Sequence, residues 1–227
     1  MCRHFFASTL TDLTIVQGYQ GASVVVSRGN CASVVCFGGD SYETEKLLRT
    51  LRSRGVRHIE AAVSAGVENS DAGDMTASYL RYIHAGTAVY DRSDLHNMPL
   101  DVICEKKAIP AFDLAGARIT TQMTGHIAVD GEGRDRTITL SIGRNVIVIG
   151  ADADTVQAAA QAANAQIVIL QKKNPGNIEK LSAKYVILLD KPSQSIYSGK
   201  EVVAGEAGRT LRLRLRANGR LKLETMD

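Results

Sequence analysis

The chain has 227 residues, 44% of them hydrophobic and 22% charged, which is typical of one large or two small globular domains. Its formal charge of +3 is too mild to indicate a nucleic-acid partner by itself. The four cysteines, Cys2, Cys31, Cys36 and Cys104, form no Cys-x-x-Cys pair, which excludes a zinc finger and a disulfide scaffold. No apolar run approaches the roughly 18 residues that cross a bilayer, and the first residues lack the long apolar stretch of a secretory signal.

The first third of the chain predicts strands followed by a helix. Apolar runs separated by glycines predict strands at 13–16, 23–27 and 32–37, with a hairpin turn at 27–30. Leu47, Leu48 and Leu51 share one face of a predicted helix over 42–54, which Gly55 ends. The next strand is expected over 56–63.

The rest of the chain predicts a second set of strands and helices. A short helix is expected over 72–83 and an alanine-rich helix over 152–165. The expected strands lie at 87–90, 101–104, 117–121, 126–129, 137–141, 146–149, 166–170 and 183–190. A terminal hairpin over 209–225 turns at Asn218-Gly219 and alternates leucine with Arg212, Arg214 and Arg216. Two strand-rich halves with helices predict one α/β domain over residues 1–227, with two sheets sandwiched between helices.

The order of these segments resembles the metallo-β-lactamase-like domain at the C-terminus of the ComEC family, the membrane channel proteins of bacterial DNA uptake. The segments that carry the resemblance are "TIVQGYQGASVVVSRG", "SVVCFGG", "LLRTLRSRGVRHIEAAVSAG", "NVIVIGADADTVQAAAQAANAQIVILQKKNPGN" and "LRLRLRANGRLKLET". They cover nearly the whole chain, from about residue 13 to residue 225. The resemblance implies a four-layer αββα sandwich of metallo-β-lactamase type, with residues 1–12 as a tail or a membrane-proximal remnant. It also implies a domain that belongs to a larger, membrane-associated bacterial protein.

Active members of that family bind one or two metal ions at strand ends, and the ligand positions are altered in this chain. The resemblance aligns the ligand positions with residues that coordinate a metal poorly or not at all, namely Ala65, Val67, Asn69, Ser70, Ala151, Lys172 and Lys173. With one inserted residue, Asp152 takes the place of Ala151, and an aspartate of the family corresponds to Cys36. We therefore expect no bound metal, no small-molecule cofactor and no catalytic residues at these positions.

Two other site hypotheses come from the residues themselves. Asp91, Asp94 and His96 form the one compact carboxylate–histidine group of the sequence, and Asp71, Asp74, Asp152 and Asp154 could also converge across strand ends and hold Mg²⁺ or Ca²⁺. A relocated site of a metal-dependent phosphodiesterase or nuclease would be built from Asp71, Asp74, Asp152 and His96. Alternatively, Asp71 and Asp154 simply cap the helices that follow them. Cys36 is a nucleophile candidate only if an imidazole lies nearby, and a buried inert thiol is the simpler interpretation.

Clustered basic residues make DNA the expected partner, through contacts with phosphates rather than bases. The candidates are Arg49, Arg52, Arg54, Arg57, Lys172, Lys173, Arg212, Arg214 and Arg216. The competing interpretation is an edge strand and a helix whose charges only face solvent. The resemblance and the altered ligand positions together imply an inactive module that is structural or guides DNA. The alternatives are the relocated-site hydrolase and a protein-interaction domain that packs on a membrane channel through an apolar remnant of the cleft.

Overall fold

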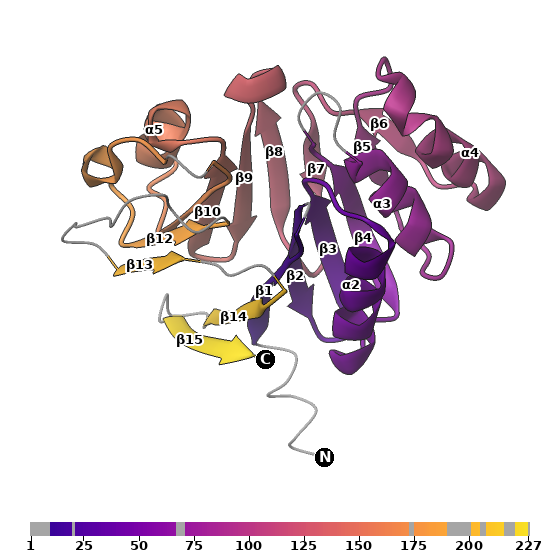
Figure 1. Ribbon diagram of the computed structural model, residues 1–227, viewed down its shortest axis with the longest axis horizontal. Helices are drawn as coiled ribbons and strands as arrows, with labels where there is room; N and C mark the ends of the chain where they lie inside the picture. The colour runs from indigo at the N-terminus through magenta and orange to yellow at the C-terminus, as the bar shows by residue number, and fades with distance from the viewer. Residues whose placement is uncertain are drawn as a thin grey trace.

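The computed structural model describes residues 10–19, 21–66, 71–172, 175–189, 201–204, 208–215 and 221–226, and these form two β-sheets flanked by helices (Figure 1). The first sheet has the strand order β15-β14-β1-β2-β3-β4-β5-β6. Its strands are β1 (Thr11–Gln17), β2 (Ala22–Arg28), β3 (Cys31–Cys36), β4 (His58–Ser64), β5 (Ala88–Tyr90), β6 (Ala111–Asp113), β14 (Thr210–Leu215) and β15 (Leu221–Met226).

The second sheet has the order β13-β12-β11-β10-β9-β8-β7. Its strands are β7 (Arg118–Thr120), β8 (His126–Asp130), β9 (Thr137–Ile142), β10 (Asn145–Gly150), β11 (Ile167–Leu170), β12 (Tyr185–Leu188) and β13 (Glu201–Ala204). In both sheets the parallel strands run consecutively, β3 to β6 and β10 to β13. Parallel strands end at the same edge of a sheet, so their carboxyl ends gather there.

Helices cover the outer face of each sheet. The first sheet carries α2 (Ser41–Ser53), α3 (Ala72–Leu80) and α4 (Met98–Lys107), and the second carries α5 (Ala153–Ala162). Short 3₁₀ turns lie at η1 (Leu95–Asn97), η2 (Gly133–Asp135) and η3 (Ile178–Lys180). Of the helices in the described residues, none is long and apolar enough to cross a membrane.

Three apolar layers hold the sandwich together, as alternation along the strands predicts. Leu13, Val63 and Ile147 belong to the layer between the two sheets. The three leucines predicted for the inner face of α2 are buried against the first sheet. Val156 of α5 packs on the outer face of the second sheet. The predicted four-layer αββα architecture is therefore confirmed.

A glutamate links the two sheets at the end of the sandwich opposite the carboxyl ends of the parallel strands. The Glu60 carboxylate accepts hydrogen bonds from the backbone N–H groups of Gln122, Met123 and Thr124 at 3.0, 2.9 and 2.8 Å, and from the Thr124 hydroxyl at 2.8 Å. The Thr124 hydroxyl also lies 2.6 Å from that of Ser33. The loop between β7 and β8 is thus held against the first sheet by the Glu60 carboxylate and the Ser33 hydroxyl.

Three elements differ from the sequence-based prediction, and one of them is β13, where no strand was predicted. Residues 101–104, expected as a strand, lie within α4, because Leu100 and Cys104 are buried one helical turn apart while Val102 between them is exposed. The three-residue strand β6 was not predicted, since it is short and largely exposed. The turn at 218–219 lies outside the described residues, although β14 and β15 do pair as an antiparallel hairpin.

Candidate functional site

The carboxyl ends of the parallel strands of both sheets meet at one end of the sandwich. The side-chain amide of Gln17, at the end of β1, donates to the carbonyl oxygen of Leu189, just after β12. Arg136, just before β9, donates through Nη1 to the carbonyl oxygen of Gly66 at 3.2 Å, just after β4. We call this end of the molecule the strand-end site, because Ala65, Ala151 and Lys172, the described positions among those expected to hold metal ligands, lie on it.

On the first sheet, two of these positions lie side by side and neither offers a usable ligand. The Ala65 N–H donates to the carbonyl oxygen of Cys36 at 2.8 Å, and both residues are buried. Burial raises the pKa of the Cys36 thiol to about 11, although Ser23, whose hydroxyl lies 3.3 Å from its sulfur, opposes this shift. The thiol is therefore neutral at pH 7, and only a thiolate is a good metal ligand or nucleophile. Val67, Asn69 and Ser70 lie outside the described residues.

On the second sheet, the predicted positions are occupied by a salt bridge and a helix cap. The Lys172 N–H donates to the carbonyl oxygen of Ala151 at 2.9 Å, so these two positions are also neighbours. The Lys172 ammonium lies 2.6 Å from one oxygen of the Asp152 carboxylate. The other oxygen accepts from the backbone N–H and the hydroxyl of Thr155 at 3.0 and 2.8 Å, which caps α5. Lys173 lies outside the described residues.

The electrostatics of this pair favour the charged carboxylate. Partial burial raises the pKa of Asp152, but the hydrogen bonds from Lys172 and Thr155 outweigh it, so that the pKa lies below its usual range. Both oxygens of Asp152 already have partners supplied by the chain itself. The helix cap was predicted for Asp154, two residues later, and the structure corrects it to Asp152, whereas Asp154 lies in the first turn of α5. Asp71 precedes α3 as predicted but makes no side-chain cap.

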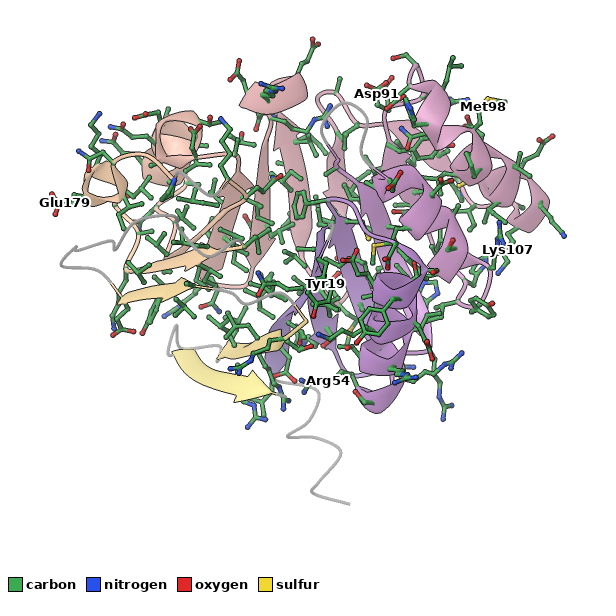
Figure 2. The ribbon with its side chains drawn as sticks, in the orientation of Figure 1. Tyr19, Arg54, Asp91, Met98, Lys107 and Glu179 are labelled. Carbon is green, nitrogen blue, oxygen red and sulfur yellow. The ribbon has the colours of Figure 1, made fainter. Side chains whose placement is uncertain are left out.

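A polar cavity of about 370 Å³ lies beside the strand-end site. Its walls come from segments 64–66, 91–97, 113–115 and 132–136, and its lining includes Asp91, Asp94, Asp113 and Glu132. Arg136 is the cation of this lining, and desolvation lowers the pKa of its guanidinium. Figure 2 shows Asp91 at this end of the sandwich, near the start of α4. The lining of this cavity is thus acidic and polar.

The carboxylates proposed for a relocated metal site do not assemble. Within the described ranges, no three histidine, cysteine, aspartate or glutamate side chains come close enough to hold a metal ion. Asp71 and Asp74 are exposed at the start of α3, and His96 pairs with Asp94 at 2.8 Å. Asp152 is engaged by Lys172, as described above. The described residues of the strand-end site also fail to fit a catalytic metal, because methyl groups, a neutral thiol and an ammonium stand at the aligned positions.

The arginines predicted to contact DNA fall into two groups. Arg54, Arg212 and Arg214 surround Asp12, with nitrogen-to-carboxylate distances of 3.5, 2.5 and 3.6 Å, and we call this group the triple-arginine cluster. Its three arginines are largely buried. Figure 2 shows Arg54 at the opposite end of the sandwich from Asp91, so the triple-arginine cluster does not border the strand-end site.

The other predicted arginines lie on the surface around α2. Arg49, Arg52 and Arg57 are exposed, and Arg49 pairs with Glu45 one turn away at 2.6 Å. Arg216 lies outside the described residues. Arg52 and Arg57 are therefore exposed cations near the end of α2. The largely buried arginines of the triple-arginine cluster instead pair with Asp12 inside the fold.

Comparison with known structures identifies the fold. The chain resembles a diphosphatase from the PhnP family (TM-score 0.57, 14% identity), covering 91% of this chain and 98% of that one. It also resembles Zn²⁺-bound PqqB from Methylobacterium extorquens (TM-score 0.58, 11% identity), covering 88% of this chain and 99% of that one. A third similar structure is the short form of human tRNase Z (TM-score 0.54, 10% identity), with 88% of this chain and 98% of that one covered. It spans about half the length of CmlA β-hydroxylase, matching 54% of that chain. No family model matches the chain, and no curated protein is significantly similar to it.

These matches define the chain as a protein of the metallo-β-lactamase fold. At identities of 9–14% they establish the fold alone. A diphosphatase and a tRNase share it, so the activity of this chain has to be argued from its own residues.

Proposed function

We propose that this chain is a non-hydrolytic module of the metallo-β-lactamase fold, and that it serves a ComEC-type DNA-uptake protein as a structural or DNA-guiding domain. The observation that carries the proposal is the salt bridge between Lys172 and Asp152 at the strand-end site. It places a cation of the chain on the one carboxylate that the alignment offers as a metal ligand. A divalent ion there would have to displace or repel the ammonium group.

The chemistry of the neighbouring positions supports the same proposal. A hydrolytic metal site of this kind needs several imidazole or carboxylate ligands around an ion that lowers the pKa of bound water. Ala65 and Ala151 offer only methyl groups, and the Cys36 thiol is buried and neutral. The acidic cavity next to the site also disfavours a phosphodiester, because its four carboxylates would repel a polyanion that no metal neutralises.

The DNA-guiding part of the proposal rests on the exposed arginines near the end of α2 and on the sequence resemblance. Arg52 and Arg57 can contact phosphates without any rearrangement of the fold. The attachment to a bacterial membrane protein rests on the resemblance alone.

The proposal is tested by metal content and nuclease activity measured on the same preparation. The purified chain is incubated with Zn²⁺, Mn²⁺ or Mg²⁺, desalted and subjected to elemental analysis, and then assayed on single- and double-stranded DNA with each ion. We expect well under one ion per chain and no metal-dependent cleavage above a protein-free control.

One or two tightly held ions per chain, or cleavage that needs Mn²⁺ or Zn²⁺, would overturn the proposal. The Asp152→Ala variant then identifies the ligand set. If it loses the ion, Asp152 is a ligand despite its salt bridge. If it retains the ion, the metal lies elsewhere in the chain.

A further inference from the structure

The strand β6 is an end strand of the first sheet, and one side of its backbone faces away from the sheet. Toward β5, the Ala88 N–H donates to the carbonyl oxygen of Pro110 at 2.9 Å, and the Leu114 N–H donates to that of Tyr90 at 3.0 Å. In a parallel ladder, alternate residues of a strand bond to the same neighbour. Phe112 therefore directs its N–H and C=O toward β5, whereas Ala111 and Asp113 direct theirs outward.

This outward side of β6 is a free edge in the described structure. Among the described residues, no backbone hydrogen bond uses the N–H or C=O groups of Ala111 or Asp113, and neighbouring β7 is itself the end strand of the second sheet. The edge thus offers two donors and two acceptors at the spacing of an added strand.

Two cavities lie on opposite faces of this edge. A groove of about 830 Å³ on the α4 side includes Tyr90, Asp101, Glu105, Ala111 and Asp113 in its lining. A second cavity of about 580 Å³ lies between β6 and β7 on the inner side of the sandwich. Its lining includes Phe112, Ala117, Ile119 and His58. Successive side chains of an added strand point to opposite faces, so they would enter the two cavities in turn.

The chemistry of the two cavities differs. The groove on the α4 side is acidic, because Asp101, Glu105 and Asp113 outnumber its one arginine, Arg92. The inner cavity has a mixed lining, in which charged and polar residues such as Glu60 and Arg118 lie beside apolar ones. It presents the ring of Phe112, which is 49% exposed although it is a large apolar side chain. A basic side chain suits the first cavity, and an apolar side chain suits the second.

We propose that β6 binds an extended segment of a partner protein as an additional β-strand, with lysine or arginine side chains alternating with apolar ones. The backbone of the segment pairs with Ala111 and Asp113. Its basic side chains face Asp101 and Glu105, and its apolar side chains pack against Phe112. This mode of recognition takes affinity from main-chain hydrogen bonds and specificity from alternate pockets.

A second copy of this chain is a poorer occupant of the same edge. Pairing two β6 strands would bring the acidic grooves of both copies, with Asp101, Glu105 and Asp113, to one junction. Like charges facing each other across a strand pair are destabilising. The charge of the groove thus favours a basic partner over self-association.

The test uses the whole chain and two synthetic hexapeptides as probes, one alternating lysine with valine and one alternating glutamate with valine. Binding is measured by titration calorimetry, and amide hydrogen exchange is followed at Ala111 and Asp113. We expect only the lysine peptide to bind, and both amides to exchange more slowly in its presence.

Ala111→Pro removes the outward N–H without removing a bond to β5, and should weaken binding about tenfold, as expected for one lost hydrogen bond of about 1.4 kcal/mol. Glu105→Gln should weaken binding about threefold, because it removes one exposed charge. Glu179→Gln, a matched change of an exposed glutamate on the far side of the molecule, should leave binding unchanged. Thermal melting checks that each variant is folded.

Binding that survives Ala111→Pro, equal binding of both peptides, or unchanged exchange at the two amides would overturn the proposal. The exchange measurement on the unaltered chain decides the question even if Ala111→Pro does not fold. A concentration-dependent dimer that forms through β6 while the lysine peptide fails to bind would assign the edge to self-association, and would likewise overturn it.

Discussion

Asp152 gives the sharpest test of whether the strand-end site is structural or functional. If its carboxylate is a helix cap and a salt-bridge partner, removing it destabilises the protein. If it were a ligand awaiting a metal, its removal would be neutral or even stabilising, because catalytic residues are often held at the expense of stability. Three variants, Asp152→Ala, Asp152→Asn and Lys172→Met, separate the contributions of the cap and the salt bridge.

The contacts of Asp152 determine how much each variant should change the free energy of unfolding. The cap supplies two hydrogen bonds to Thr155, and losing an aspartate cap costs about 1 kcal/mol, within a range of about 0.5–2 kcal/mol. The Lys172 side chain is 47% exposed, so the salt bridge contributes less than about 1 kcal/mol. We expect Asp152→Ala to lower the free energy of unfolding by about 1–2 kcal/mol. Asp152→Asn keeps an oxygen for Thr155, so it and Lys172→Met should each lower it by less than about 1 kcal/mol.

Urea denaturation measures these changes, and its pH dependence adds an independent check. A loss of about 1–2 kcal/mol corresponds to a melting temperature about 2–4 °C lower in a chain of this size. Because the pKa of Asp152 is lowered in the folded state, its contribution is present above the unfolded pKa of about 3.9 and is lost as the pH falls through the folded pKa. The difference between the wild type and Asp152→Asn should therefore shrink below about pH 4. An Asp152→Ala variant as stable as the wild type would refute the structural interpretation.

Three further outcomes follow from the contacts described above. Glu60→Gln should lower the free energy of unfolding by about 2–3 kcal/mol, because the side-chain amide cannot accept hydrogen bonds from all four donors of the β7–β8 loop. Urea denaturation measures this loss, and a loss under about 0.5 kcal/mol would contradict the prediction. In a variant with Cys2 and Cys104 replaced by serine, Cys31 should react with a thiol reagent at pH 8. Buried Cys36, whose pKa is about 11, should stay unmodified until the protein unfolds, and rapid modification of both thiols would refute its burial. If DNA binds, replacing Arg52 and Arg57 by alanine should weaken binding and flatten its salt dependence in fluorescence anisotropy. A matched substitution in the triple-arginine cluster should mainly lower the melting temperature, and equal losses of affinity would contradict the division into two groups.

The layers of the fold could be predicted from the sequence because their signals are local. The leucines of α2 repeat with helical spacing, and the strands of the core are apolar runs bounded by glycines. The helix α4 escaped prediction because segment 101–104 contains three apolar residues in a row of four and reads equally well as a strand. Pro99 in its first turn and Lys106 and Lys107 in its last are the signals that favour a helix.

The site was harder to predict because its contacts join distant parts of the chain. The salt bridge joins residues 152 and 172, and the polar cavity collects four loops spread over about 70 residues. Alternation placed Arg212 and Arg214 on one face of a strand, yet their common partner Asp12 lies some 200 residues earlier. A pattern of alternating residues shows which face a side chain occupies, but not what lies against that face.

The internal pairing of charges in the described residues explains why the two proposals concern different parts of the molecule. Asp12 is surrounded by arginines, Glu60 is bound by the β7–β8 loop, and Asp152 is bound by Lys172 and Thr155. These carboxylates sit where they stabilise the sandwich, so little of their charge is available to a ligand. Asp101 and Glu105 differ, since they border an open groove beside a free strand edge. The proposed loss of a metal site at the strand ends is thus compatible with partner binding elsewhere, because the proposed partner uses the backbone of β6 and the groove beside it.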